Sequence, residues 1–184
     1  MEGKIMCASL FPASRLKQNG FSLLELVVTL AITGALVAAA GFEFAGWMSR
    51  YRVESQIKTL YSDLMALRIR ALEKNVQHVA MLSGSGYNSC EDSNNNDTCD
   101  PGEPVLEGLS NSGMKYPLAW KLGLGVDKIV FDGKGLFWPN GSIRLLKPDN
   151  VNSWTPGEVD YDCIVIYITR IKPGKYNGTK CVMR

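Results

Sequence analysis

The amino-terminal part of the chain contains a run of seventeen residues, 26–42, that carries no formal charge and consists mainly of Leu, Val, Ala and Ile. This length is close to the minimum that crosses a bilayer as an α-helix. Arg15 and Lys17 precede the run, so the positive-inside rule predicts that the residues before it stay in the cytoplasm. The rest of the chain is therefore expected to be exported and held by a single membrane span.

Glu25 directly precedes this run. A carboxylate close to a membrane span costs up to about 3 kcal/mol on insertion scales, which indicates that it has a partner. Two simpler interpretations leave Glu25 unexplained. One is a secretory signal cleaved beside residues 38–40, which are all alanine, and the other is an uncleaved anchor with no further role.

Residues 17–26, KQNGFSLLEL, resemble the processing site of type IV prepilins and type II secretion pseudopilins. The resemblance implies that a membrane-bound prepilin peptidase cuts after Gly20 and methylates the new amino group of Phe21. It also implies that Glu25, then the fifth residue of the mature chain, pairs with the amino terminus of a neighbouring subunit. An ammonium group and a carboxylate neutralise each other in low dielectric, and neither has another obvious partner in the apolar run.

Beyond the run, apolar residues recur in steps of mostly three or four, which predicts one helix from Phe21 to near Asn75. The members of this pattern are Trp47, Tyr51, Ile57, Leu60, Tyr61, Leu64, Leu67 and Leu72. The expected organisation is a cleaved leader (1–20), a transmembrane and assembly helix (21–45), an amphipathic helix half (46–76) and a β-rich globular head (77–184).

The head is predicted from short β-prone runs separated by Gly, Asn, Asp and Pro. Strands are expected over residues 78–82, 105–109, 128–131, 142–146, 163–169 and 181–183. Turns are expected at residues 132–135, 139–142 and 173–178. The predicted fold class is α+β, with a long amino-terminal helix packed on an antiparallel β-sandwich head.

The chain has five cysteines, an odd number for an exported protein. Cys7 falls in the leader. The other four form two local groups, Cys90 with Cys99 and Cys163 with Cys181, which predicts two disulfides in an oxidising compartment. A zinc site is the alternative, although zinc sites usually bring cysteines in C-x2-C pairs or add histidines, and the single histidine, His78, is distant in sequence from all four.

Three segments, residues 68–72, 92–106 and 129–135, together resemble the GspH/FimT group of minor pilins and pseudopilins. The resemblance implies a pilin-like fold and a structural, non-enzymatic subunit at or near the filament tip that helps to initiate or cap assembly. Its partners would be other pilin or pseudopilin subunits, the prepilin peptidase and the inner membrane. The head would lie in the periplasm until the subunit enters a filament. A type IV pilus and a type II secretion pseudopilus remain alternatives, because the amino-terminal signal is common to both.

The loop after residue 91 suggests calcium as a cofactor. Counting from Asp92, oxygen-bearing side chains fall at loop positions 1, 3, 5, 9 and 12, and these are Asp92, Asn94, Asn96, Asp100 and Glu103. The sixth position is Asp97 where an EF-hand requires glycine, and no second helix is expected. The alternative is a polar connection closed by Cys90 and Cys99.

DNA capture is a further hypothesis, because some FimT-like minor pilins are implicated in DNA uptake through basic carboxy-terminal residues. The candidates here are Arg170, Lys172, Lys175, Lys180 and Arg184. Against it, the formal net charge of +2 arises within residues 1–20, which leaves the mature chain near neutral. A singly anchored periplasmic enzyme is the least favoured alternative, since the sequence has no G-x-S-x-G elbow, Walker loop or metal-binding histidine pair.

Overall fold

The computed structural model describes residues 20–147 and 159–184 of the chain. The chain forms two compact units, one ending at Glu43 and one comprising Phe44–Arg184. Apart from Gly20, the predicted leader lies outside the described residues.

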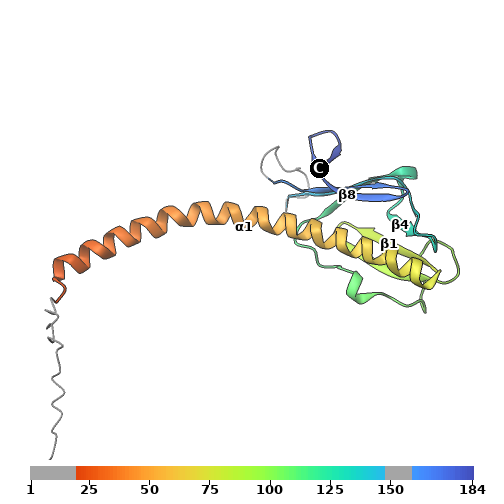
Figure 1. Ribbon diagram of the computed structural model, residues 1–184, viewed down its shortest axis with the longest axis horizontal. Helices are drawn as coiled ribbons and strands as arrows, with labels where there is room; N and C mark the ends of the chain where they lie inside the picture. The colour runs from red at the N-terminus through yellow and green to blue at the C-terminus, as the bar shows by residue number, and fades with distance from the viewer. Residues whose placement is uncertain (1–19, 148–158) are drawn as a thin grey trace, which may run out of the picture. The chain divides into compact units, whose positions relative to one another are not determined.

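A single α-helix, α1 (Leu23–Lys74), runs through the end of the first unit and the start of the second (Figure 1). Its 52 residues include no proline, so no backbone donor is missing from its interior. Asn75 ends it with a φ of 54°, the left-handed conformation that Asn tolerates at a helix C-terminus. The predicted long helix is confirmed.

In the second unit, α1 contributes one apolar stripe to the core. The stripe repeats at steps of four and three residues, as an amphipathic helix requires, and comprises Val53, Ile57, Leu60, Leu64, Leu67 and Ala71. Trp47, Tyr51 and Leu72 also belong to the apolar repeat of the sequence, but they are exposed and do not contribute to this stripe. They lie off the face that the repeat of the stripe defines, so their apolar character does not make them core residues.

The rest of the second unit consists of two antiparallel sheets. The four-stranded sheet has the order β2-β1-β4-β5, and the five-stranded sheet has the order β3-β6-β7-β8-β9. Their bounds are β1 (Gln77–Ser83), β2 (Gly86–Asp92), β3 (Leu118–Leu122), β4 (Lys128–Phe131), β5 (Phe137–Trp138), β6 (Gly141–Leu145), β7 (Cys163–Tyr167), β8 (Arg170–Tyr176) and β9 (Cys181–Met183). Two short 3₁₀ helices, η1 (Glu107–Leu109) and η2 (Gly123–Gly125), lie in the connections.

One apolar core joins the helix to both sheets. It includes the α1 stripe, Ile129 and Phe131 of β4, and Ile164 and Ile166 of β7, all fully buried. A smaller cluster of Val79, Cys90 and Val130 covers the other face of the four-stranded sheet. A helix and two antiparallel sheets around a shared core form the predicted α+β fold.

The predicted strand over residues 105–109 was wrong. Val105 makes only an isolated bridge to Cys90, and the chain then turns through η1. The buried residues here are Leu106 and Leu109, three positions apart, a spacing that suits a 3₁₀ turn rather than the alternation of a strand.

The predicted turn at residues 173–178 was also placed too early. Pro173, Gly174 and Tyr176 belong to β8, and the connection to β9 begins at Asn177. Strand β9 pairs with β8 only from Gly174 onward. Pro173, which has no N–H to donate, therefore lies just before the first residue pair between β8 and β9. Strands β2, β3, β5 and β8 were not predicted.

Candidate functional site

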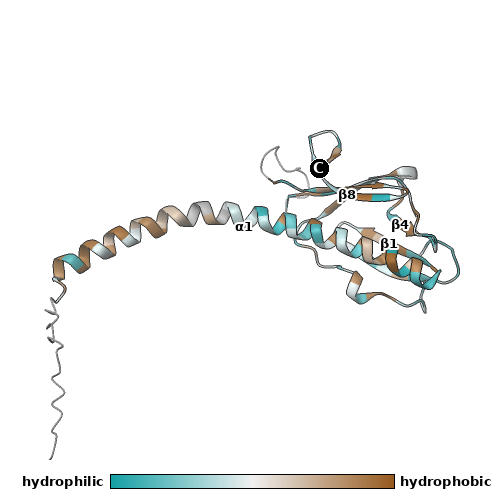
Figure 2. Cartoon of the chain, viewed as in Figure 1, coloured by the Kyte–Doolittle hydropathy of each residue, from teal (hydrophilic) through white to brown (hydrophobic). Residues whose placement is uncertain are grey.

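No part of the described chain covers the apolar side chains at the start of α1. Its most apolar window, Leu23–Ala40, is coloured mainly brown and white in Figure 2 and has a mean hydropathy of 2.2. None of this window is buried. By length and composition this helix can cross a membrane. Water is an unfavourable environment for so many exposed Leu, Val and Ile side chains, so lipid or other apolar helices must cover them.

Glu25 is the only charged residue in this window and lies in the first turn of α1. Among the described residues it makes no ion pair and no hydrogen bond. The hydroxyls of Thr29 and Thr33, by contrast, donate to backbone carbonyls of their own helix, at 2.9 Å to Leu26 and 2.8 Å to Thr29. Glu25 is thus the one charged group of this window, and no described residue neutralises its carboxylate.

The bond between Gly20 and Phe21 lies outside helical structure, two residues before α1 begins. Both residues are exposed, and a Cβ built on Gly20 would meet no heavy atom within 4 Å. A peptidase that cleaves here would find an exposed, non-helical backbone.

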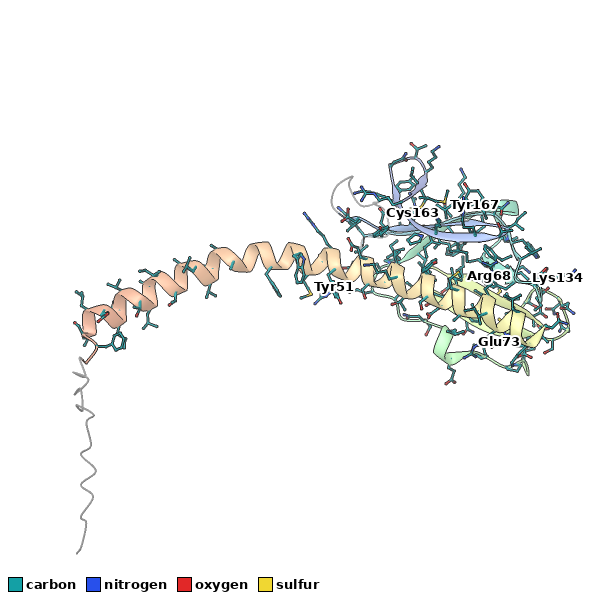
Figure 3. All side chains as sticks on the ribbon, viewed as in Figure 1. Tyr51, Arg68, Glu73, Lys134, Cys163 and Tyr167 are labelled. Carbon is teal, nitrogen blue, oxygen red and sulfur yellow. A yellow bond between two sulfur atoms is a disulfide. The ribbon has the colours of Figure 1, made fainter. Side chains whose placement is uncertain are left out.

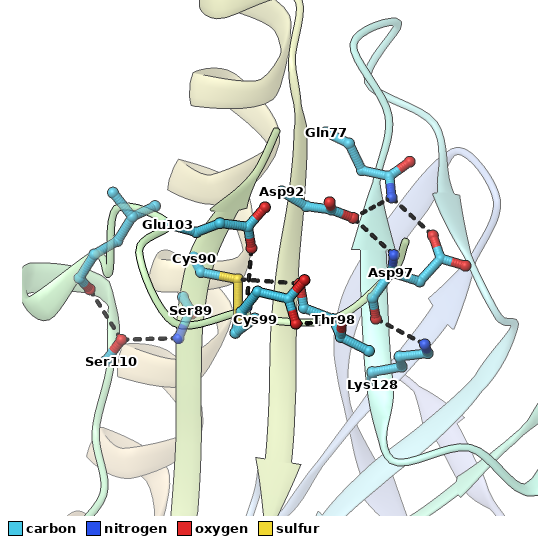
Figure 4. The surroundings of a disulfide bond; sticks show 12 residues. Gln77, Ser89, Cys90, Asp92, Asp97, Thr98, Cys99, Glu103, Ser110 and Lys128 are labelled. Carbon is cyan, nitrogen blue, oxygen red and sulfur yellow. Dashed lines mark hydrogen bonds between the residues drawn. A yellow bond between two sulfur atoms is a disulfide. The ribbon is translucent and has the colours of Figure 1, made fainter. Parts of the chain in front are cut away.

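The Cys90–Cys99 disulfide closes the polar loop after β2, with a Cα–Cα distance of 5.7 Å (Figure 4). Asp92 is buried at the end of β2 and organises this loop through three hydrogen bonds. It accepts from Gln77 Nε2 at 2.7 Å and from the backbone N–H groups of Asn96 and Asp97 at 3.2 and 2.8 Å. A buried carboxylate requires such partners, so Asp92 serves here as the structural anchor of the loop.

The other predicted calcium ligands bond to one another. Asp100 accepts from the side-chain amides of Asn94 and Asn96 at 2.9 and 2.6 Å, and these bonds lower the pKa of its carboxyl. Glu103 accepts from the backbone N–H groups of Ser93 and Asp100, at 2.9 and 3.0 Å. Every predicted ligand oxygen therefore already accepts a hydrogen bond, since those of Asn94 and Asn96 accept from backbone N–H groups of the loop.

Within residues 20–147 and 159–184, no group of three or more His, Cys, Asp or Glu side chains is arranged to hold a metal ion. The structure therefore does not gather Asp92, Asp100 and Glu103 into the expected cation site. The spacing matched an EF-hand loop, but Asp97 replaces the glycine of its sharp turn, and the disulfide closes the loop instead.

The second disulfide, Cys163–Cys181, joins β7 to β9 across β8, with a Cα–Cα distance of 6.1 Å. The sequence predicted strands over residues 163–169 and 181–183 with only a turn between them, whereas β8 lies between β7 and β9 in the sheet. The disulfide passes over β8 at Gly174, which pairs with Cys163. A Cβ on Gly174 would lie 3.1 Å from Cys181 Sγ and 2.4 Å from the backbone oxygen of Val182, so only glycine leaves room.

The five basic residues considered for DNA binding do not form one group. Arg170 and Lys172 alternate with buried Ile171 and point away from the core, whereas Lys175 lies on the opposite side of β8 by the same alternation. Arg184 forms an ion pair with Asp160 at 2.9 Å. Lys180, in the β8–β9 turn, lines a hollow of about 400 Å³ together with Lys121 and Arg144.

Two contacts that the sequence did not suggest hold α1 against the rest of the second unit. Tyr87 of β2 donates its hydroxyl to Asp63 of α1, and burial together with this bond raises the pKa of the tyrosine. Gln56 of α1 donates from Nε2 to the carbonyl of Tyr116 at 2.7 Å and accepts from its N–H at 3.2 Å. In both cases the sequence shows a polar residue, Asp63 or Gln56, beside the apolar stripe of the helix. This position was the one sign in the sequence that each residue could have a buried partner.

Arg68, labelled on α1 in Figure 3, adds a third contact. Its guanidinium lies 5.4 Å from the centre of the Phe137 ring. It belongs to one of the three segments on which the GspH/FimT resemblance rests. In another of these segments, the Asp132 carboxylate accepts from the N–H groups of Lys134 and Leu136 and shapes the turn after β4. These residues have structural roles in this fold.

Comparison with known proteins identifies the amino terminus. Residues 15–41 match the family described as the prokaryotic N-terminal methylation motif. This match confirms the predicted prepilin-type amino terminus. Cleavage after Gly20, methylation of Phe21 and pairing of Glu25 stay predictions. No curated protein matches the chain.

Among solved structures, the chain is similar to the type IV minor pilin FimU of Pseudomonas aeruginosa strain PAO1. The two are 13% identical, and the match covers 74% of this chain and 99% of the other with a TM-score of 0.49.

Proposed function

We propose that this type IV pilin-like chain is a minor pilin or pseudopilin, a structural subunit that helps to initiate or cap a type IV pilus or type II secretion pseudopilus. In this proposal the chain is inserted once in the inner membrane, with its head in the periplasm. The prepilin peptidase cleaves after Gly20 and methylates Phe21, and the mature chain then enters the filament beside other subunits.

The methylation motif over residues 15–41 is the observation that carries this proposal. From Leu23 onward the motif lies on an apolar helix whose window Leu23–Ala40 is not buried by the described chain. Glu25, the one carboxylate of the motif, has no partner among the described residues. Lipid can cover the apolar side chains before assembly, and the helices of other subunits can cover them afterwards. The amino group of Phe21 from a neighbouring subunit would neutralise Glu25.

Mass spectrometry of the mature amino terminus tests this proposal. The expected mature protein begins with N-methylated Phe21 when the chain is produced with a prepilin peptidase, and it remains uncleaved without the peptidase. A Gly20→Val variant should stay uncleaved. A mature protein that begins at Gly41 would instead identify an ordinary secretory signal and refute the assignment.

A second candidate function, capture of DNA, is favoured by the charge of the five-stranded sheet. Its strands contain Lys121, Arg144, Arg170, Lys172 and Lys175 and no Asp or Glu. Binding of labelled duplex should weaken as salt increases and should be lost when Arg170 and Lys172 are replaced by Gln. A Lys175→Gln variant, on the opposite side of β8, provides the matched control. No binding at low salt would eliminate this function.

A further inference from the structure

The first two turns of α1 in the second unit expose a row of aromatic side chains. Phe44, Trp47 and Tyr51 are 59%, 58% and 59% exposed, and their ring centres lie 5.8 and 6.0 Å apart in sequence order. Their spacing of three and four residues places them along one side of the helix. Val53 and Ile57 of the buried stripe face the opposite way, so the core cannot cover this row.

A basic hollow of about 270 Å³ adjoins the end of this row at Tyr51. Its lining includes two cations, Arg52 and Lys115, and two hydroxyl residues, Ser55 and Thr59, but no carboxylate. The two hydrogen bonds between Gln56 and the backbone of Tyr116 fix the Lys115 segment against α1. Both cations are therefore held on the same hollow, although they are far apart in sequence.

Glu54 is the nearby carboxylate on the helix, and it is engaged elsewhere. It lines the adjacent hollow, which shares Tyr51, Ser55 and Thr59 with the basic one. Its carboxylate lies 3.9 Å from the Lys58 ammonium and accepts from the N–H of Asp160 at 3.1 Å. The basic hollow thus keeps its positive character, and its chemistry suits a phosphate group, which two cations and neighbouring hydroxyls can bind.

The position of these residues along the helix indicates where the phosphate comes from. About twenty helical residues cross the hydrocarbon core of a bilayer, so a span that starts at Leu23 reaches the headgroup layer near residue 42. Phe44 and Trp47 follow within about 8 Å of helix rise. Aromatic rings are enriched at this depth, and basic side chains next to a span attract anionic lipids.

We propose that Phe44, Trp47 and Tyr51, together with Arg52 and Lys115, form a membrane-interface patch that binds anionic phospholipid through its phosphate. The rings enter the boundary between headgroups and acyl chains, and the basic hollow receives the phosphate. This inference rests on the proposed membrane-anchored subunit. It adds that the head is docked on the lipid surface before it enters a filament.

The test uses the full mature chain at one copy per nanodisc, with Trp47 as the only tryptophan after Trp120→Phe, Trp138→Phe and Trp154→Phe. Lipids brominated near the carbonyl end of the acyl chain should quench Trp47 about twofold or more, and lipids brominated near the chain end should quench it less. If the triple variant does not fold, the same quenching is measured on the native chain and on Trp47→Phe. The difference between their emissions then gives the contribution of Trp47.

The basic hollow is tested by energy transfer from Trp47 to dansyl-labelled phosphatidylglycerol, compared with dansyl-labelled phosphatidylcholine. Each basic side chain near an anionic surface contributes about fivefold to affinity, so Arg52→Gln with Lys115→Gln should abolish a preference for phosphatidylglycerol. A variant with Lys121→Gln and Lys172→Gln, which removes two cations of the five-stranded sheet, should keep it. Displacement by soluble glycerol 3-phosphate would assign the hollow to a free phosphate ligand and overturn the proposal.

Three further outcomes separate the possibilities. A chain that washes out of the nanodiscs contradicts the proposed anchored subunit itself. A chain that remains, but whose Trp47 is quenched by aqueous acrylamide and by no brominated lipid, refutes the lipid patch alone. Shielding of Trp47 that occurs only with several copies per disc would identify the aromatic row as a contact between subunits, which also overturns the proposal.

Discussion

At the scale of single residues, the most consequential feature is that polar side chains on α1 fix the helix to the rest of the second unit. Asp63 and Gln56 interrupt an otherwise regular apolar pattern, yet each bonds to a residue far along the chain, Tyr87 and Tyr116. The sequence indicates that such residues lie on the helix. Their partners depend on how the sheets fold, which periodicity does not encode.

Replacing Tyr87 with Phe should destabilise the second unit by about 1.5–3 kcal/mol, because a buried hydroxyl bond to a carboxylate is lost. The measurement is urea unfolding of the mature chain in detergent, followed by circular dichroism. Tyr167→Phe is the matched control, since Tyr167 is exposed on β7. Equal stability of the two variants would contradict the structural role of the Asp63–Tyr87 bond.

Asp162 provides a pH-dependent prediction. Its side chain is only 2% exposed, and burial raises the pKa of its carboxyl, although the N–H of Tyr176 donates to it at 2.6 Å. Because the folded pKa lies above the unfolded one, the stability linked to this group is fully present below the unfolded pKa. It is lost as pH rises through the folded value.

An Asp162→Asn variant keeps an acceptor for the N–H of Tyr176 but carries no charge to bury. It should therefore be more stable than the native protein at neutral pH, and its melting temperature should decrease less between about pH 4 and pH 8. Thermal unfolding across this range provides the comparison, with exposed Asp160→Asn as control. If the native protein instead became more stable than Asp162→Asn as the pH rises over this range, the folded pKa of Asp162 would be lowered and not raised.

At the scale of elements, the sequence predicted well wherever one local rule decided the outcome. The long helix and strands β1, β4 and β9 follow from apolar periodicity and β-branched runs. The strand predicted over residues 105–109 was wrong because its buried leucines are three positions apart. Strand β8 was missed because Pro173 and Gly174 look like a turn, and only the pairing with β7 and β9 makes them a strand.

The Cys163–Cys181 bridge is predicted to retain the three-residue strand β9. Replacing both cysteines with Ser should lower stability by about 2–4 kcal/mol, since the bridge constrains the unfolded chain. Hydrogen exchange should then show loss of protection in β9 before the other strands.

Gly174→Ala tests the same crossing without removing a sulfur. The added methyl group would lie 2.4 Å from the Val182 oxygen, so β9 should separate from β8 and exchange faster. Gly108→Ala is the control, because a Cβ there meets no heavy atom within 4 Å. Unchanged protection of β9 in Gly174→Ala would argue against the close crossing.

At the scale of the whole molecule, the chain combines a head that buries most of its own apolar side chains with a helix segment whose apolar side chains no described residue buries. The apolar side chains of the head are largely buried by α1 and the two sheets, whereas Leu23–Ala40 is wholly exposed. The sequence predicted this division from the uncharged run and Glu25. It could not predict which head surfaces are concave or basic, because residues such as Arg52 and Lys115 are brought together only by the folded chain.

This division makes Glu25 the residue on which assembly should depend. Glu25→Gln keeps the shape of the side chain but cannot neutralise the amino group of a neighbouring Phe21. Leaving one charge of a buried pair without its partner costs about 3–5 kcal/mol, so incorporation into filaments should decrease by about a hundredfold or more. Cleavage after Gly20 should continue, because the scissile bond lies outside α1.

The measurement compares the processed fraction, determined by mass spectrometry, with the amount of subunit in sheared filaments. Glu107→Gln serves as a control, because it removes an exposed carboxylate of the head while leaving Glu25 intact. A Glu25→Gln subunit that is cleaved and enters filaments at the native level would show that the carboxylate is not paired during assembly. An uncleaved Glu25→Gln chain would place the role of this residue in recognition by the peptidase.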